Sequence, residues 1–91
     1  MLNQLQDELK SAMKNAEKTK ILALRNFIGK LKATQIDKGR EINNEESIKV
    51  LKTVAKQLKE SIKQYKNGGR NDLVKKEKIE LDILEKFLPN N

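Results

Sequence analysis

The chain of 91 residues contains no cysteine and no histidine. Without cysteine it has no disulfide, no thiolate ligand for zinc and no thiol nucleophile. Without histidine it lacks the imidazole on which most general-base catalysis and many metal sites depend. We therefore expect no catalytic residues, no metal ligands and no bound cofactor.

Aromatic residues and long apolar runs are also scarce. Phenylalanine, tyrosine and tryptophan make up 3% of the chain and hydrophobic residues of all kinds 36%, so the core must be mainly aliphatic. No apolar run approaches the roughly 20 residues that span a bilayer. The opening residues, MLNQLQDELK, lack the basic and apolar segments of a signal peptide. We expect a cytoplasmic protein that makes no use of the membrane.

Charge is abundant but unevenly distributed. The net charge is +7, and 17 of the 20 basic residues are lysine. Residues 1–40 hold nine basic and four acidic side chains, whereas residues 67–91 hold five of each. Scattered lysines are more typical of a solvated helix face than of a phosphate-binding surface. The sequence predicts that any basic patch would lie in the amino-terminal half.

Apolar residues recur at helical spacing in four segments, and no segment alternates with period two. We expect one helix from residue 2 to about residue 15, and others over about 19–37, 45–66 and 72–88. Helices of this length are marginal in isolation and must pack on one another. The predicted fold is all-α, a small bundle of four helices joined by short loops, in a single domain over residues 1–91.

The ends of these helices carry recognisable signals. Gly39 suits a left-handed cap, and Pro89 stops the last helix. Glu45 and Glu46 place negative charge in the first turn of the third helix, where the helix dipole favours it. The remaining boundary residues are candidate caps or turn residues: Asn15, Thr19, Asn43 or Asn44, and Asn71 or Asp72.

Two short motifs and the aromatic residues have ordinary structural explanations. Ser11 and Lys14 fit the S-x-x-K spelling of a serine acyl-enzyme, but that motif has meaning only beside its partner motifs in a larger fold. The NGGR stretch at 67–70 lacks the strand and spacing of a phosphate loop, and better fits a helix stop followed by a helix start. Phe27, Tyr65 and Phe87 lie on apolar faces and are predicted to be core residues.

Glu77 and Glu80 are the one constellation with chemical content. With Leu73 at zero on a helical wheel, they fall near 40° and 340°, within the apolar face of the last helix. A general acid–base pair would need a cleft, and a metal site would need further carboxylates or histidines. A buried ion pair needs only a cation, and Arg25 falls inside the apolar arc of the second helix, which is taken to run from Phe27 round to Leu22. The favoured interpretation is a structural ion cluster of Arg25, Glu77 and Glu80.

Several of these residues also belong to longer motifs. The stretches LRNFIGKLKATQIDKGRE and NNEESIKVLKTVAKQLKESIKQYKNGGRNDLVKKEKIELDILEKFLP closely resemble the amino-terminal half of the YqeY-like proteins. That family shares a domain with the carboxy-terminal part of the B subunit of the tRNA-dependent amidotransferase. The motif positions are occupied by Leu24, Arg25, Lys56, Ser61, Arg70, Asp72, Leu73, Glu77, Glu80, Leu84, Leu88 and Pro89. Leu58 departs from the pattern where the family usually has arginine, and Phe87 replaces a tyrosine.

The resemblance implies a function, although no catalytic site comes with it. It implies a non-catalytic helical adaptor associated with tRNA amidation, and a family label of carbon–nitrogen ligase with glutamine as amido-N-donor. Family members continue into a smaller distal domain implicated in holding tRNA, which we expect to be absent here. The expected partners are tRNA, bound weakly, or a protein related to the amidotransferase. The alternative is a free-standing RNA-binding or protein-interaction module without any link to amidation.

Overall fold

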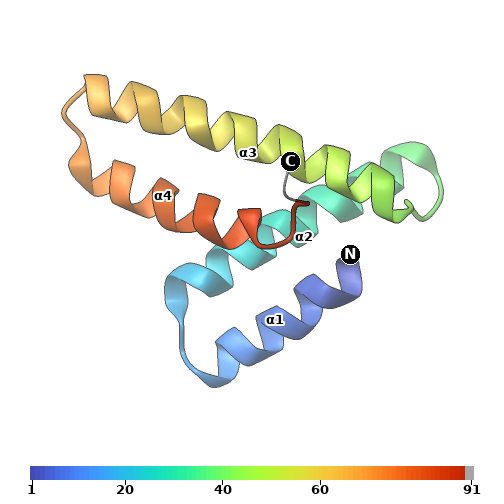
Figure 1. Ribbon diagram of the computed structural model, residues 1–91. Coiled ribbons are helices and arrows are strands. Elements are labelled where there is room, and N and C mark those ends of the chain that lie inside the picture. Colours follow the sequence, from blue (N-terminus) through green and yellow to red (C-terminus); the bar gives the residue numbers. More distant parts are fainter. Residues whose placement is uncertain (90–91) are drawn as a thin grey trace.

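The computed structural model describes residues 1–89 as four helices joined by short connections. They are α1 (Leu2–Lys14), α2 (Lys18–Lys38), α3 (Asn44–Asn67) and α4 (Asn71–Glu85), and no strand occurs within this part of the chain. The predicted all-α fold is confirmed. Helices α1 and α2 form one antiparallel hairpin and α3 and α4 another (Figure 1). Helix α2 packs against all three other helices and so joins the two hairpins.

The core is built from aliphatic side chains and a single phenylalanine. Phe27, Leu24 and Leu31 of α2 are almost completely buried, as are Leu5 of α1, Leu51 of α3 and Leu84 of α4. These side chains belong to one hydrophobic cluster to which every helix contributes. Burying each such side chain stabilises the fold by about 1.5–3 kcal/mol relative to leaving it exposed. Among the described helices, none is both long enough and apolar enough to cross a membrane.

The connection between α2 and α3 is fixed by Asn43 and Glu46. The Asn43 side chain accepts a hydrogen bond from the Glu46 backbone N–H at 2.9 Å, and the Glu46 carboxylate accepts one from the Asn43 N–H at 3.1 Å. The capping box starts α3 and makes Asn43 the N-cap, one of the two residues that the sequence offered, while Glu46 was expected only to place negative charge in the first turn. Arg40 donates two hydrogen bonds to the same carboxylate, at 2.9 and 2.8 Å, and Lys38 lies 3.1 Å away. The hydrogen bonds from Arg40 are the main reason that the pKa of Glu46 lies far below its ordinary value.

Other boundary predictions were wrong in detail. Gly39 adopts the left-handed conformation as expected, but before α2 that conformation belongs to Ala16 (φ 53°) and not to Asn15. Thr19 lies inside α2, which begins after Glu17. The predicted cap of α4 was also wrong. Asn71 and Asp72 belong to the helix itself, and Arg70, the residue before them, makes no side-chain capping hydrogen bond.

Helix α4 ends three residues earlier than predicted. The backbone N–H groups of Phe87 and Leu88 bond to the carbonyls of Leu84 and Glu85, an i to i−3 pattern that tightens the chain into a turn. Pro89 follows and has no N–H with which to continue the helix. Leu88 and Pro89 are thereby carried back toward α3.

Candidate functional site

The structure does not form the predicted ion cluster. Arg25 is exposed, while Glu77 and Glu80 are half-buried on α4. Five ion pairs occur among residues 1–89, and none of them includes any of these three side chains. Glu77 and Glu80 were predicted to lie within the apolar face as parts of a buried ion pair. They are only half-buried, and the assignment of Arg25 as their partner is wrong.

The error came from the width assigned to the apolar face of α2. Leu22 was counted within that face, but its side chain is 57% exposed. The buried residues Ala23, Leu24, Phe27, Ile28 and Leu31 occupy a narrower arc. At about 100° per residue, Arg25 lies about 130° from the middle of that arc, which points its side chain toward solvent.

Glu77 and Glu80 instead influence each other. The pKa of Glu80 is raised to about 7, mainly by burial and further by the adjacent Glu77 carboxyl, through a hydrogen bond and through its charge. Lys76 lowers the pKa of Glu80 by a smaller amount. The Glu80 carboxyl therefore stays protonated at pH values at which an ordinary glutamate is ionised. Within residues 1–89, no three metal-ligating side chains gather as a metal ion would require.

The remaining motif residues separate into two groups at opposite ends of the α3–α4 hairpin. Arg70 and Asp72 lie at the turn between the helices, where Nε of Arg70 is 3.5 Å from Oδ1 of Asp72. This contact is the main reason that the pKa of Asp72 is lowered. Lys56 and Pro89 line a groove at the other end, and Ser61 lies half-buried on α3 between the two groups. The motif therefore does not converge on one site.

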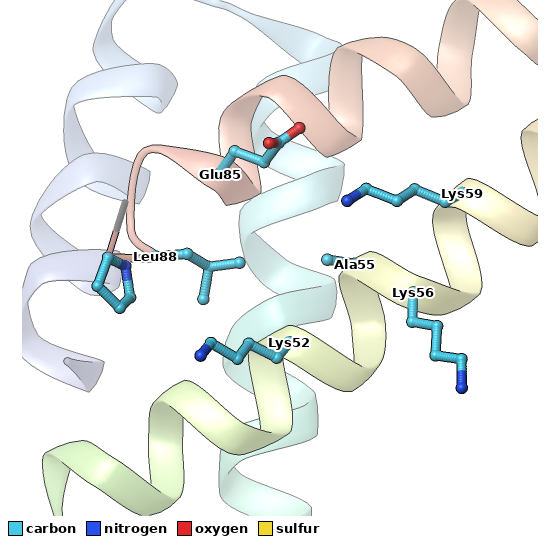
Figure 2. A pocket seen from close by; sticks show the side chains of 7 residues that line it. Lys52, Ala55, Lys56, Lys59, Glu85 and Leu88 are labelled. Atoms are coloured by element: carbon cyan, nitrogen blue, oxygen red, sulfur yellow. The ribbon is translucent and has the colours of Figure 1, made fainter. Parts of the chain in front are cut away.

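This groove is open and has a volume of about 390 Å³. Ala55 and Leu88 supply apolar surface, and the charged residues around it are Lys52, Lys56, Lys59 and Glu85. In Figure 2 the amino group of Lys59 points toward the side of the groove where Glu85 lies, Lys52 extends toward Leu88, and Lys56 turns away. The groove exists because the turn after α4 brings Leu88 and Pro89 over α3.

The groove lies beside a row of lysines that the sequence analysis missed. All six lysines of α3 lie within about 100° of arc on one side of that helix; they are Lys49, Lys52, Lys56, Lys59, Lys63 and Lys66. Each is exposed, and none takes part in an ion pair with another described residue. We call this set the α3 lysine row. The signal was the alternating spacing of three and four residues, which a tally of charge by segment does not detect.

The family model described as "Yqey-like protein" matches residues 2–91, which is nearly the whole chain.

Three yeast relatives carry the name "Altered inheritance of mitochondria protein 41, mitochondrial". The Saccharomyces cerevisiae (strain ATCC 204508 / S288c) protein is 32% identical over 85 residues, which cover 92% of this chain and 46% of the relative. The Candida glabrata protein is 31% identical over 91 residues, covering 97% and 50%. The Eremothecium gossypii protein is 27% identical over 88 residues, covering 96% and 48%. The chain spans about half the length of the curated relatives it matches.

Proposed function

Because this chain belongs to the YqeY-like family, we propose that it is a non-catalytic helical adaptor associated with glutamine-dependent tRNA amidation. The proposal is supported by the resemblance of its motifs to the helical part of the amidotransferase B subunit. The family label of carbon–nitrogen ligase then describes the reaction that the adaptor serves, while the bond-forming steps belong to other proteins. Its partners are tRNA, bound weakly, or a protein related to the amidotransferase.

One observation carries this proposal. The motif residues Lys56 and Pro89 both belong to the lining of an open groove whose surroundings are lysines, one carboxylate and aliphatic side chains. A shallow surface of this kind can hold a macromolecule by charge and shape. Acyl or phosphoryl transfer would instead need an oriented nucleophile and base at hydrogen-bonding distance.

The test is association with the amidotransferase. The purified chain is mixed with the amidotransferase of the same organism, with and without tRNA, and complex formation is followed by sedimentation velocity. We expect a complex, and we expect the chain alone to release no ammonia from glutamine. Ammonia release by the pure protein contradicts the proposal. So does the absence of a complex with the amidotransferase in both conditions, with tRNA and without it.

We propose the cytoplasm as the site of action. The names of the yeast relatives point to mitochondria for those proteins, so the two locations are distinguished by fractionating cells that express the tagged full-length gene product. Enrichment in an organelle fraction would replace the cytoplasmic assignment without affecting the adaptor proposal.

The lysine row also favours a second candidate function, a free-standing RNA-binding module that has no link to amidation. The two candidates predict different results in the sedimentation experiment. A free-standing module binds RNA but does not associate with the amidotransferase after treatment with ribonuclease.

A further inference from the structure

We infer that the α3 lysine row, together with the groove beside it, is a contact surface for the phosphate backbone of RNA. The inference rests on the proposed function only in taking tRNA as the RNA concerned. It assigns the contact to the helical domain itself, at a surface defined by six named lysines.

The lysine row has the dimensions of a backbone contact. At a rise of about 1.5 Å per residue, the 17 steps from Lys49 to Lys66 span about 26 Å. A nucleic-acid strand in a duplex carries one phosphate per about 3.4 Å of axis, so the row runs beside about seven phosphates. Its lysines repeat about every 5 Å, and each carries a flexible stem that can adjust to the exact phosphate positions.

The charges of the row are available to an outside ligand. Elsewhere in the described part of the chain, Glu46 is occupied by Arg40 and Lys38, and Glu8 lies 3.2 Å from Lys20. No such partner neutralises the six lysines of the row. Three carboxylates lie near it: Glu45 in the first turn of α3, Glu60 beside the row on the same helix, and Glu85 at the groove. Six lysines against three carboxylates leave the local balance positive.

The groove adds a second feature that suits a nucleotide. Lys52 and Lys59 flank it, and Ala55, Leu88 and Pro89 line it with apolar atoms (Figure 2). A nucleotide presents a planar face that can lie on apolar surface and a phosphate that can reach a lysine. The combination favours a strand whose base enters the groove while its backbone follows the row.

The surroundings of the row argue against an anionic membrane as its ligand. An amphipathic helix that binds a bilayer inserts an apolar face beside its basic residues. The apolar face of α3 is buried in the core. The large exposed hydrophobic residues are Met13, Leu22, Ile36 and Ile79, which belong to the other three helices. Helix α3 therefore offers charge to a ligand without an apolar surface for insertion.

The test removes three charges from the row and compares the result with the removal of three charges elsewhere. The row variant is K52Q/K56Q/K59Q. The matched control is K10Q/K14Q/K30Q, whose lysines are exposed on α1 and α2 and take part in no ion pair with another described residue. Binding of fluorescently labelled tRNA is measured by anisotropy from about 25 to about 100 mM salt. Non-specific contacts of this kind have dissociation constants of about 10⁻⁴ to 10⁻⁶ M at physiological salt and bind more tightly at lower salt.

We expect the unmodified chain to show a slope of log K against log salt of about −4 to −5, if all six lysines reach phosphates at about 0.7–0.9 each. The row variant should bind tRNA at least about tenfold more weakly than the unmodified chain. The magnitude of its slope should be smaller by about 2–3, whereas that of the control should be smaller by less than about 1. The charge-preserving variant K52R/K56R/K59R should keep both affinity and slope. Circular dichroism of all variants checks that the helices are retained.

Three results would overturn the inference. The first is an equal loss of tRNA affinity in the row variant and the control, which would show that net charge alone is responsible. The second is row-dependent binding to phosphatidylserine vesicles without row-dependent binding to tRNA. The third is loss of association with ribonuclease-treated amidotransferase in the row variant while tRNA affinity is unchanged, which would make the row a protein-binding surface.

The same measurements separate this inference from the proposed function. If the row variant behaves like the control toward tRNA but the chain still sediments with the amidotransferase, only the inference fails. If tRNA binding depends on the row but no amidotransferase complex forms, only the adaptor proposal fails.

Discussion

The pair of half-buried carboxylates on α4 makes the stability of the fold depend on pH. Burial and the neighbouring Glu77 raise the pKa of Glu80 from 4.5 to about 7. The folded state therefore holds a proton on Glu80 more tightly than the unfolded chain does. The resulting stabilisation is fully present below pH 4.5, and is lost as the pH rises through about 7. Glu80→Gln removes the titration and keeps nearly the same shape.

The size of the effect follows from the shift in the pKa of Glu80. A change from 4.5 to about 7 corresponds to about 3 kcal/mol, since one pKa unit is worth about 1.4 kcal/mol. Glu80 keeps contact with solvent, and screening reduces the contribution of such a group to about 1 kcal/mol. For a domain of this size, 1 kcal/mol moves the melting temperature by about 4–8 °C.

The assay is thermal unfolding followed by circular dichroism at pH 5 and pH 8, for the unmodified chain and for Glu80→Gln. When the pH is raised from 5 to 8, the free energy of unfolding of Glu80→Gln should increase by about 1 kcal/mol relative to that of the unmodified chain. The chain has no histidine, so the α-amino group is the main other group that ordinarily titrates in this range, and it cancels in the comparison. Asp82→Asn, which neutralises an exposed carboxylate on the same helix, serves as the matched control.

A difference in stability between Glu80→Gln and the unmodified chain that is the same at both pH values would refute this reasoning. So would an equal pH dependence of the difference for Asp82→Asn, because the effect would then come from the overall charge of α4. Carbon-13 NMR of the glutamate side chains gives an independent check, with an expected midpoint near pH 7 for Glu80 that moves toward its ordinary value in Glu77→Gln.

The remaining predictions concern the stability of the fold and are all measured by urea unfolding at neutral pH. Asn43→Ala should cost about 1 kcal/mol by removing one half of the capping box, and Asn43→Ser should restore most of it. Gly39→Ala should cost about 1 kcal/mol because a side chain is strained at φ 67° although space is available, so a neutral result would contradict that backbone conformation. Leu24→Ala should cost about 2–5 kcal/mol because Leu24 is completely buried. Arg25→Ala should change stability by less than about 0.5 kcal/mol, and a large loss would revive the ion cluster that the structure does not form.

The fold could be predicted because local and global signals agree in this sequence. The Asn43–Glu46 capping box and the left-handed Gly39 are local devices whose geometry depends on a few neighbouring residues. The end of α4 could not be placed from the sequence in the same way. The residues up to Leu88 continue the helical pattern, but the chain tightens at Glu85 before Pro89.

The candidate site was harder to predict because a helical wheel gives the angle of a side chain but not how far the contact with another helix extends. Arg25 and Leu22 lie beyond the edge of the α2 contact, although the wheel placed both with the apolar residues. The lysine row was fully visible in the spacing of the α3 lysines. It was missed because charges were counted by segment, over residues 1–40 and 67–91, and not around the helix that lies between those segments.

The arrangement of the helices around α2 also determines how the molecule opens locally. Helix α1 packs mainly on α2 and has little contact with α3 or α4, whereas α2 packs on all three of its neighbours. Detaching α1 breaks one helix interface, but detaching α2 breaks three. Amide hydrogens of α1 can therefore exchange through partial opening that leaves the α3–α4 hairpin folded, while those in the middle of α2 exchange only when the whole domain unfolds.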